Sequence, residues 1–458
     1  MRDMTPSFDA LSTRLDLIDS ASAFVTQDES KLLAFYLPQF HRTVENSEWW
    51  GPGFTEWTNV AGGKPNFEGH YQPHIPRELG FYDLTHPDVM YEQAEMARLY
   101  GVYGFCFYHY WFSGRRILEK PVDNFIKSDI DIKFCLCWAN ENWTRTWSGD
   151  EKSVLLEQQY ADDDDERFIE SLLEFFRDPR YIFVQGKPML VVYRAKNMPD
   201  PKASFARWRL LAVQHGFLGL HIAVVDFYDI QSPAEVNADA LVEFPPHKFN
   251  GPQSVPDTVL TFTAPGFAGG VVDYLKIIAQ SAKREVPPFK LYRGIIPSWD
   301  NTARRQLTPT TVVNATPTLF GQWLRYLRAY TRENKRDHSD DFIFINAWNE
   351  WGEGCHLEPD LKWGLGYLEE MLKSSYSYGV PKGSDEARED LYAAVTALID
   401  VSSPSGAYIA DPERVSDKLR NFKPVDNYVY RISARLLRWP LLYKIARSIY
   451  LLARRIGG

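Results

Sequence analysis

Short apolar runs alternate with helical patterns along most of this chain. Apolar runs of this length between turn-forming residues are typical of buried strands. We predict strands at residues 31–40, 102–112, 132–138, 188–195, 220–226, 240–245, 291–298 and 342–348. Apolar residues at helical spacing predict helices at 87–100, 121–128, 164–177, 204–215, 270–284 and 316–334. Pro87 and Pro121 suit first helical turns, and Ser204 suits a helix N-cap.

The order of these elements predicts an α/β fold. Eight strands separated mostly by helices across residues 31–376 favour a (β/α)8 TIM barrel with long βα loops and a helical C-terminal extension. A doubly wound open sheet is the alternative. The sequence lacks a G-x-G-x-x-G motif after its first strand and lacks a G-x-x-x-x-G-K-[ST] motif, which disfavours the nucleotide-binding versions of that sheet.

Three segments flank the predicted barrel. Residues 1–30 form an N-terminal extension, and residues 377–426 form a linker with a helix predicted at 385–401. The tail, 427–458, holds seven Lys or Arg residues and no acid. Its apolar residues recur at spacings of three and four, which predicts a basic amphipathic helix. Such a helix lies in a membrane interface and favours anionic lipid, whereas packing against the acidic barrel is the alternative.

Charge, cysteines and hydropathy narrow the function classes. The formal net charge of −9 argues against nucleic-acid binding. The four cysteines lack zinc-site spacing, so reduced, packed thiols are expected, as in a cytoplasmic protein. Residues 1–30 lack the apolar core of a secretory signal, and no apolar stretch is long enough to span a bilayer. We therefore expect a cytoplasmic protein whose tail allows peripheral contact with the inner face of the plasma membrane.

Polar and aromatic side chains accumulate where the predicted strands end. Active sites of (β/α)8 barrels lie at this end of the strands. Aromatic rings stack on sugars while amides and acids bond hydroxyls, so the mixture favours a carbohydrate cleft over a purely structural core. The segment 45–76, predicted as one long loop, is expected to form a lid or wall. The candidate substrate-binding residues are Tyr36, Gln39, Glu56, Trp57, Tyr108, Tyr110, Trp138, Asn140, Glu141, Tyr193, Asp226, Glu243, Trp299, Asn349 and Trp351.

The most informative stretch follows the last predicted strand. It places Glu350 and Glu353 three residues apart, beside Trp348 and Trp351. Chemistry at a glycosidic bond needs one protonated acid at the leaving oxygen and one ionised carboxylate that acts as base or nucleophile. Nearby tryptophans lower the local polarity and raise the pKa of one carboxyl relative to the other. We predict that both glutamates are catalytic; an acidic pair that only caps a turn is the alternative.

Metal and cofactor chemistry is not predicted. Glu56, Glu141, Asp226 and Glu243 suit hydroxyl ligands better than a metal centre, because the histidines are scattered along the chain. We therefore expect neither a metal nor a cofactor.

The motifs together resemble the WbsX-like family of bacterial polysaccharide-biosynthesis proteins, which is glycoside hydrolase family 99-like. The resemblance covers about residues 31–375. The matching stretches are FYLPQFH at 35–41, GFTEW at 53–57, YHYW at 108–111, WANE at 138–141 and WNEWGEG at 348–354.

The resemblance implies a (β/α)8 barrel and a retaining mechanism. The family 99 motif has the form Asn-Glu-Trp-His-Glu-Gly, and its two acids correspond to Glu350 and Glu353. By resemblance, Glu350 is the base that deprotonates the sugar 2-hydroxyl to form a 1,2-anhydro intermediate, and Glu353 is the general acid/base at the leaving oxygen. The chain departs from the motif at Gly352, which stands where the family has histidine. Mannose specificity does not carry over.

These observations predict a carbohydrate-active enzyme acting at a glycosidic bond during surface-polysaccharide or O-antigen assembly. Its expected partner is a glycan or lipid-linked oligosaccharide. Two alternatives stay open: a glycosyltransferase that uses an activated sugar donor, and a non-catalytic glycan-binding assembly protein. For the transferase, Asp129-Ile130-Asp131 is a weak Asp-x-Asp motif on an outer turn.

Overall fold

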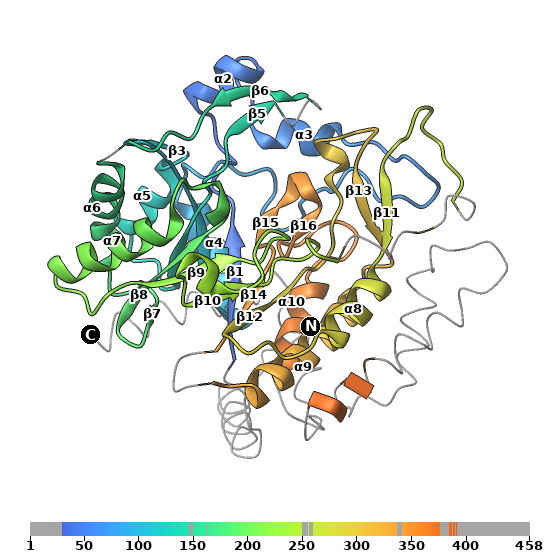
Figure 1. Ribbon diagram of the computed structural model, residues 1–458. Coiled ribbons are helices and arrows are strands. Elements are labelled where there is room, and N and C mark those ends of the chain that lie inside the picture. The colour runs from blue at the N-terminus through green and yellow to red at the C-terminus, as the bar shows by residue number, and fades with distance from the viewer. Residues whose placement is uncertain are drawn as a thin grey trace, which may run out of the picture. The chain divides into compact units, whose positions relative to one another are not determined.

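Eight parallel strands close into a barrel (Figure 1). The computed structural model describes residues 30–145, 150–161, 163–249, 255, 260–336, 341–375, 384–386, 388–389 and 391. Around the barrel the strands pair in the order β1, β2, β4, β8, β9, β10, β12 and β14, and β14 pairs again with β1. Their bounds are β1 Lys31–Tyr36, β2 Val102–Phe112, β4 Lys133–Trp138, β8 Lys187–Val192, β9 His221–Val225, β10 Ala240–Val242, β12 Leu291–Ile295 and β14 Phe342–Ile345. The predicted (β/α)8 barrel is confirmed, and each barrel strand overlaps a predicted run, although five of the strands end three or four residues earlier than predicted.

Helices connect most of these strands and surround the barrel. Most begin at residues that favour a helix start: Pro87 opens α4, and the Thr316 side chain caps α9 by accepting the Leu319 N–H. The helices are α2 Val44–Trp50, α3 Glu56–Gly62, α4 Pro87–Leu99, α5 Lys120–Ile126, α6 Asp164–Phe176, α7 Pro201–Gln214, α8 Tyr274–Lys283, α9 Pro317–Glu333 and α10 Gly366–Ser375.

Three predicted elements are corrected. The 45–76 segment is not one irregular loop, because it contains the short helices α2 and α3. Helix α7 starts three residues before Ser204, since Asp200 caps it and Pro201 opens it. The first four residues of the helix predicted at 270–284 form a strand, β11, whose partner is β13.

The remaining elements are short. Among the described residues, no helix is both long and apolar enough to cross a membrane. Residues 384–386, 388–389 and 391 are helical, in agreement with the start of the helix predicted there, while the extension 1–29 and the tail 427–458 lie outside the described residues. The other strands are β3 Arg115–Ile117, β5 Trp143–Arg145, β6 Asp150–Leu156, β7 Phe183–Val184, β11 Gly270–Asp273, β13 Thr310–Val313, β15 Asn349–Glu350 and β16 Cys355–His356.

The barrel strands are buried on both faces, as parallel strands under helices are. In β1, the Phe35 ring lies inside the barrel against Tyr108, Phe244 and Phe344. The next residue, Tyr36, faces outward and donates its hydroxyl to Gln93 of α4. Successive side chains of one strand therefore pack alternately inside the barrel and against the surrounding helices. The loops that follow the C-terminal ends of the strands are left to form the site.

Candidate active site

The loop after β14 turns back on itself and presents both predicted acids. Strands β15 and β16 pair antiparallel, with Glu350 opposite Cys355, and a short 3-10 helix of Trp351–Glu353 joins them. Asn349 anchors this loop to the end of β1, because its side-chain oxygen accepts the Leu37 N–H at 2.8 Å and its nitrogen donates to the Leu37 carbonyl at 3.0 Å. Asn349 was predicted to contact substrate, but its side chain instead fixes the loop after β14 to the end of β1.

Three carboxyl groups converge on one guanidinium. Arg304 Nη1 donates to Glu353 at 2.7 Å, Nη2 donates to Glu350 at 3.1 Å, and Nε donates to Glu56 at 2.9 Å. Glu56 is fully buried at the start of α3, and its other oxygen accepts from Gln39 at 3.1 Å. The structure therefore brings together four predicted residues, Gln39, Glu56, Glu350 and Glu353, around one arginine that was not predicted.

Asp300 holds Arg304 in place. Its side chain caps the 3-10 helix Asn301–Ala303, which leads directly into Arg304, by accepting the Thr302 N–H at 3.0 Å. Its backbone N–H donates to the Glu353 carbonyl at 2.6 Å. Its carboxylate also contacts His70 at 2.6 Å and accepts from Gln72 at 2.7 Å. Asp300 thereby connects the loops that follow β1, β12 and β14.

The pKa values of Glu350 and Glu353 are both raised above the usual value of a glutamate. Burial, followed by the charge of Glu353, raises the pKa of Glu350 to about 8, against the opposing effect of Arg304. Burial also raises the pKa of Glu353, with Arg304 again opposing the shift and Glu56 adding to it. Both shifts favour the protonated form of a carboxyl, and acid–base chemistry at a glycosidic bond requires one protonated and one ionised acid.

Aromatic hydroxyls line the space beside the acids. Burial raises the pKa of Tyr108 and Tyr110, and in each case the charge of Glu350 adds to the shift. The pKa of Tyr193 is raised by burial and by Glu141 and Glu353. Tyr110 is half-buried and stacks on Trp143 at 5.5 Å between ring centroids. These rings give the acid pair an aromatic wall drawn from the ends of β2 and β8.

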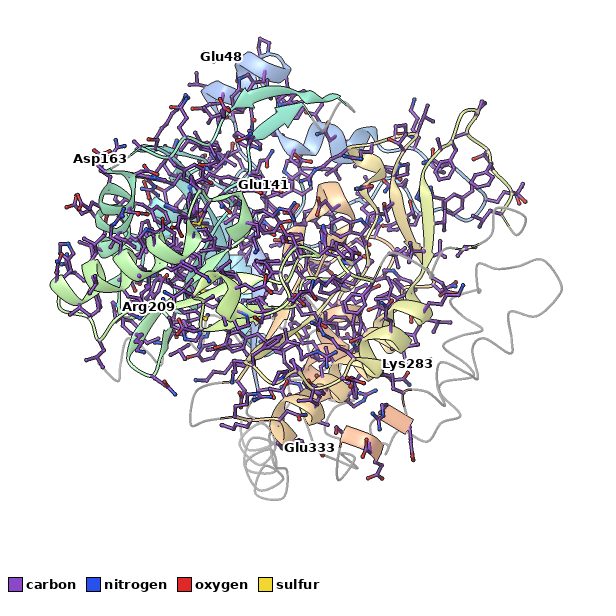
Figure 2. All side chains as sticks on the ribbon, in the orientation of Figure 1. Glu48, Glu141, Asp163, Arg209, Lys283 and Glu333 are labelled. Carbon is purple, nitrogen blue, oxygen red and sulfur yellow. The ribbon has the colours of Figure 1, made fainter. Side chains whose placement is uncertain are left out.

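Glu141 follows β4 (Figure 2), and its charge is among those that raise the pKa of Glu353. Its carboxylate pairs with Arg194 at 3.2 Å, and its side chain is half-exposed. Burial raises the pKa of Glu141, while Arg194 opposes the shift. Asn140, the neighbouring predicted residue, bonds the backbone of Arg194 through both ends of its amide, at 2.7 and 2.9 Å, so it fixes the loop instead of facing a ligand.

Two predicted aromatic residues point away from the acids. Tyr36 bonds α4, and Trp138 packs between the barrel and the helices, 4.6 Å from Phe168 and 5.7 Å from Trp208 between ring centroids. The prediction that Tyr36 and Trp138 bind substrate is therefore corrected: both rings are core.

Asp226 and Glu243 form a buried ion network. Asp226 accepts from Lys248 and Arg284, each at 2.6 Å, and Glu243 accepts from Arg284 at 2.7 Å and from Arg293 at 2.8 Å. Because these carboxylates are already bonded to cations, their predicted role as hydroxyl ligands is corrected to a structural one.

The remaining predicted tryptophans differ in their surroundings. Trp57 and Trp351 pack together at 5.7 Å, and their indole N–H groups donate to the Tyr82 carbonyl and to Glu358. Trp351 is part of the loop that carries the acids, and Trp57 packs against it from α3, so both rings are packed inside the protein, which corrects their predicted stacking role. Trp299 is buried near His247, and within the described part of the chain its Nε1–H finds no protein acceptor. It stays a candidate donor to a ligand.

One cluster has donor types that metal ions accept. His74, His356 and Asp360 place ligand atoms within 4.8 Å of one another, all buried. His74 Nδ1 and His356 Nε2 lie 2.9 Å apart, and His356 Nδ1 contacts the Glu358 carbonyl at 2.8 Å. Burial lowers the pKa of His74 to about 3 and also lowers the pKa of His356, and the two rings contact each other directly. This contact ties the 70–76 loop to the loop that follows β14.

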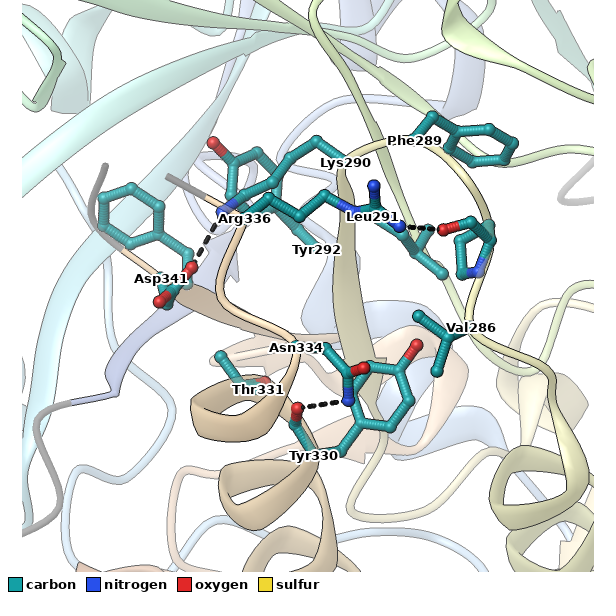
Figure 3. A pocket seen from close by; sticks show the side chains of 12 residues that line it. Val286, Phe289, Lys290, Leu291, Tyr292, Tyr330, Thr331, Asn334, Arg336 and Asp341 are labelled. Carbon is teal, nitrogen blue, oxygen red and sulfur yellow. Dashed lines mark hydrogen bonds and ion pairs between the residues drawn. The ribbon is translucent and has the colours of Figure 1, made fainter. Parts of the chain in front are cut away.

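A small pocket opens at the other end of the barrel, where β12 and β14 begin (Figure 3). Its volume of about 20 Å³ leaves room for roughly one water molecule and none for a sugar ring. The ion pair between Lys290 and Asp341, 2.7 Å long, runs beside it. The acids lie at the opposite end of the barrel, after β14.

The chain is similar to several known proteins. A profile described as glycosyltransferase WbsX matches residues 32–371. Two strains of Xanthomonas campestris pv. campestris have an uncharacterized protein WxcX that is 39% identical over 382 residues, 82% of this chain and 52% of theirs. The chain thus spans about half the length of these relatives.

Solved structures give weaker matches. A GH99 endo-alpha-mannosidase from Bacteroides thetaiotaomicron aligns at 11% identity and a TM-score of 0.46, over 80% of this chain and all of its own. A glycoside hydrolase-like protein aligns at 14% identity and a TM-score of 0.47, over 76% of this chain and 94% of its own. The strand order already establishes the barrel without them. With its profile match across most of the chain, this protein belongs to the WbsX glycosyltransferase family.

Proposed function

We propose that the chain is a retaining carbohydrate-active enzyme that acts at a glycosidic bond through Glu350 and Glu353, in the assembly of a bacterial surface polysaccharide. One observation carries the proposal: both carboxyls contact the terminal nitrogens of the same guanidinium at the C-terminal end of the barrel. Such closeness suits retaining enzymes, whose carboxyl groups lie roughly 5–5.5 Å apart, better than inverting ones, which need room for a water between them.

The proposed reaction divides the proton transfers between the two acids. Glu350 removes the proton of the sugar 2-hydroxyl as O2 attacks C1, while Glu353 protonates the departing glycosidic oxygen. The ionised Glu353 then takes a proton from the incoming water or sugar hydroxyl that opens the 1,2-anhydro ring at C1, and Glu350 returns its proton to O2. Hydrolysis and transglycosylation differ only in which hydroxyl enters.

The pH dependence of kcat/KM tests the two-acid assignment. The proposed reaction needs the pair to hold one proton, and the pKa of Glu350 is raised to about 8. We therefore expect kcat/KM to fall about tenfold per pH unit once the pH passes roughly 8, because the pair then loses its last proton. The measurement is a pH–rate profile of the free enzyme. A profile that keeps rising above pH 8 would contradict the assignment.

A glycosyltransferase with an activated donor is the second candidate, and the family description favours it. Its weak point is the donor site. Asp129-Ile130-Asp131 lies before β4, at the opposite end of the barrel from the acids; Asp131 pairs with Arg98 and Asp129 accepts from Tyr91. In addition, three carboxyls around one arginine give a site of net negative charge, which repels a nucleoside diphosphate.

The test is incubation of the protein with a panel of lipid-linked glycans and a panel of nucleotide sugars, followed by detection of products. Cleavage or rearrangement of a glycan in the absence of any nucleotide sugar supports the proposal. Product formation that strictly requires a nucleotide sugar supports the transferase. Binding of glycans without any product supports a non-catalytic assembly role.

We also propose that the tail 427–458 brings the barrel to the membrane surface where lipid-linked glycans reside. Its seven cations and regular apolar spacing support the proposal. In co-sedimentation with anionic vesicles, the full chain should bind and the chain ending at residue 426 should not. Equal binding by both, or binding by neither, contradicts the tail's role; neutral vesicles serve as the control.

A further inference from the structure

Arg304 occupies space that a side chain at position 352 would take. A Cβ atom built on Gly352 would lie 2.2 Å from Glu56 Oε1 and 2.8 Å from Arg304 Nε, both closer than van der Waals contact allows. A side chain there would exclude the guanidinium from its place among Glu56, Glu350 and Glu353. The glycine and the arginine therefore form one structural unit.

We propose that Arg304, admitted by Gly352, is the positioning residue of the acid pair: it holds one negative charge in the pair and aims both carboxyls at the same point. This inference rests on the function proposed above and adds a residue to it. Arg304 acts through the two glutamates and is not itself assigned a proton transfer.

The geometry of the contacts requires arginine. Nε, Nη1 and Nη2 each donate to a different carboxyl, at 2.9, 2.7 and 3.1 Å. A planar guanidinium presents these donors in a fixed fork, whereas a lysine ammonium is a single point charge that cannot meet three separate directions. Glu56 is the buried counter-ion that fixes the orientation of the fork, since Gln39 holds its second oxygen.

Charge gives the second reason. Without the cation, repulsion between the buried carboxyls would favour the protonated forms of Glu350 and Glu353 more strongly. A two-acid reaction needs one of them ionised. The other ionisable groups that act on the pair do not replace the cation, because they are acids or neutral at pH 7: Glu56, Tyr108, Tyr110, Glu141, Tyr193 and Cys355.

The test needs no substrate. The melting temperature of wild type and Arg304→Gln is measured between pH 5 and pH 8. Losing the cation raises the folded-state pKa of Glu353 further above its unfolded value, whereas Glu350, whose pKa is already about 8, adds to the effect only above pH 8. The folded variant must then bind protons that the unfolded chain has released, so its deficit grows with pH through this window. We expect the difference in Tm to widen by roughly 5 °C.

Two comparisons distinguish a positioning role of Arg304 from a role in packing alone. In a Glu350→Gln/Glu353→Gln background, the same Arg304→Gln change should lose more than half of its pH dependence. The control Arg284→Gln breaks the buried pairs with Asp226 and Glu243, and its Tm profile should not respond to the glutamine background. A deficit of Arg304→Gln that is constant with pH, or one that is unchanged in the double-glutamine background, overturns the proposal. If Arg304→Gln does not fold, Gly352→His provides the same comparison by displacing the guanidinium.

Activity gives an independent reading once a glycan is turned over. Arg304→Ala should lose at least about 100-fold in kcat, and added guanidinium should restore part of it, whereas it should not restore Glu350→Gln. Absence of any glycan turnover by wild type would count against the proposed function alone, because the Tm comparison stands without it. Turnover by wild type with no loss in Arg304→Ala would count against the positioning role alone.

Discussion

Replacing Glu350 or Glu353 with glutamine is expected to abolish turnover while leaving the fold intact. Each change removes proton transfer with almost no change in volume, and loss of general acid–base catalysis typically costs about 100-fold or more. The amide oxygen of glutamine still accepts from Arg304, so the loop between β15 and β16 keeps its anchor. Turnover is measured on the glycan found by the panel, with Tm as the check on folding.

A matched control comes from the same end of the barrel. Glu48 on α2 is exposed, and Glu48→Gln removes a carboxyl without touching the acid pair. It should keep wild-type turnover. If Glu350→Gln and Glu353→Gln also keep wild-type turnover, the assignment of both residues is wrong. If only one of the two variants keeps wild-type turnover, the reaction needs a single acid, which contradicts the proposed retaining mechanism.

Trp138→Ala is expected to lose stability, whereas Tyr110→Ala is expected to lose glycan binding. Trp138 is 2% exposed and packs against Phe168 and Trp208, so truncation leaves a cavity that costs about 3–5 kcal/mol of the free energy of unfolding. Tyr110 is half-buried beside the acids, so its truncation should cost little stability and weaken glycan binding. Urea denaturation gives the stabilities, and titration with glycan gives binding per folded molecule. Weak binding by folded Trp138→Ala, with normal binding by Tyr110→Ala, would reverse these assignments.

The barrel was predictable because each of its strands is a short apolar run separated from the next by turn-forming residues. The direction of each side chain was not. A strand buried on both faces is apolar throughout, so periodicity carries no information on which residues face the barrel interior. For this reason Tyr36 and Trp138 appeared as wall residues although they face the helices. Only the interior positions, such as Tyr108, reach the acids.

The acid pair was predictable because two carboxyls stand three residues apart at a strand end, between tryptophans. Arg304 was not, because it is close to the acids only in space, on the loop after β12. One signal was available: Glu56, Glu350 and Glu353 in the same predicted bowl require a nearby cation. The same reasoning does not reveal that Asp226 and Glu243 are already paired with Arg284, since that contact also joins distant segments.

The anomeric configuration of the first-formed product tests the central claim most directly. The glycan identified by the panel is incubated with the protein, and the product is followed by proton NMR before mutarotation. Two acids held on one guanidinium predict a product that retains the configuration of the substrate and that forms in neither Glu350→Gln nor Glu353→Gln. A product of inverted configuration would contradict the proposed chemistry, as would a retained product formed equally by both variants.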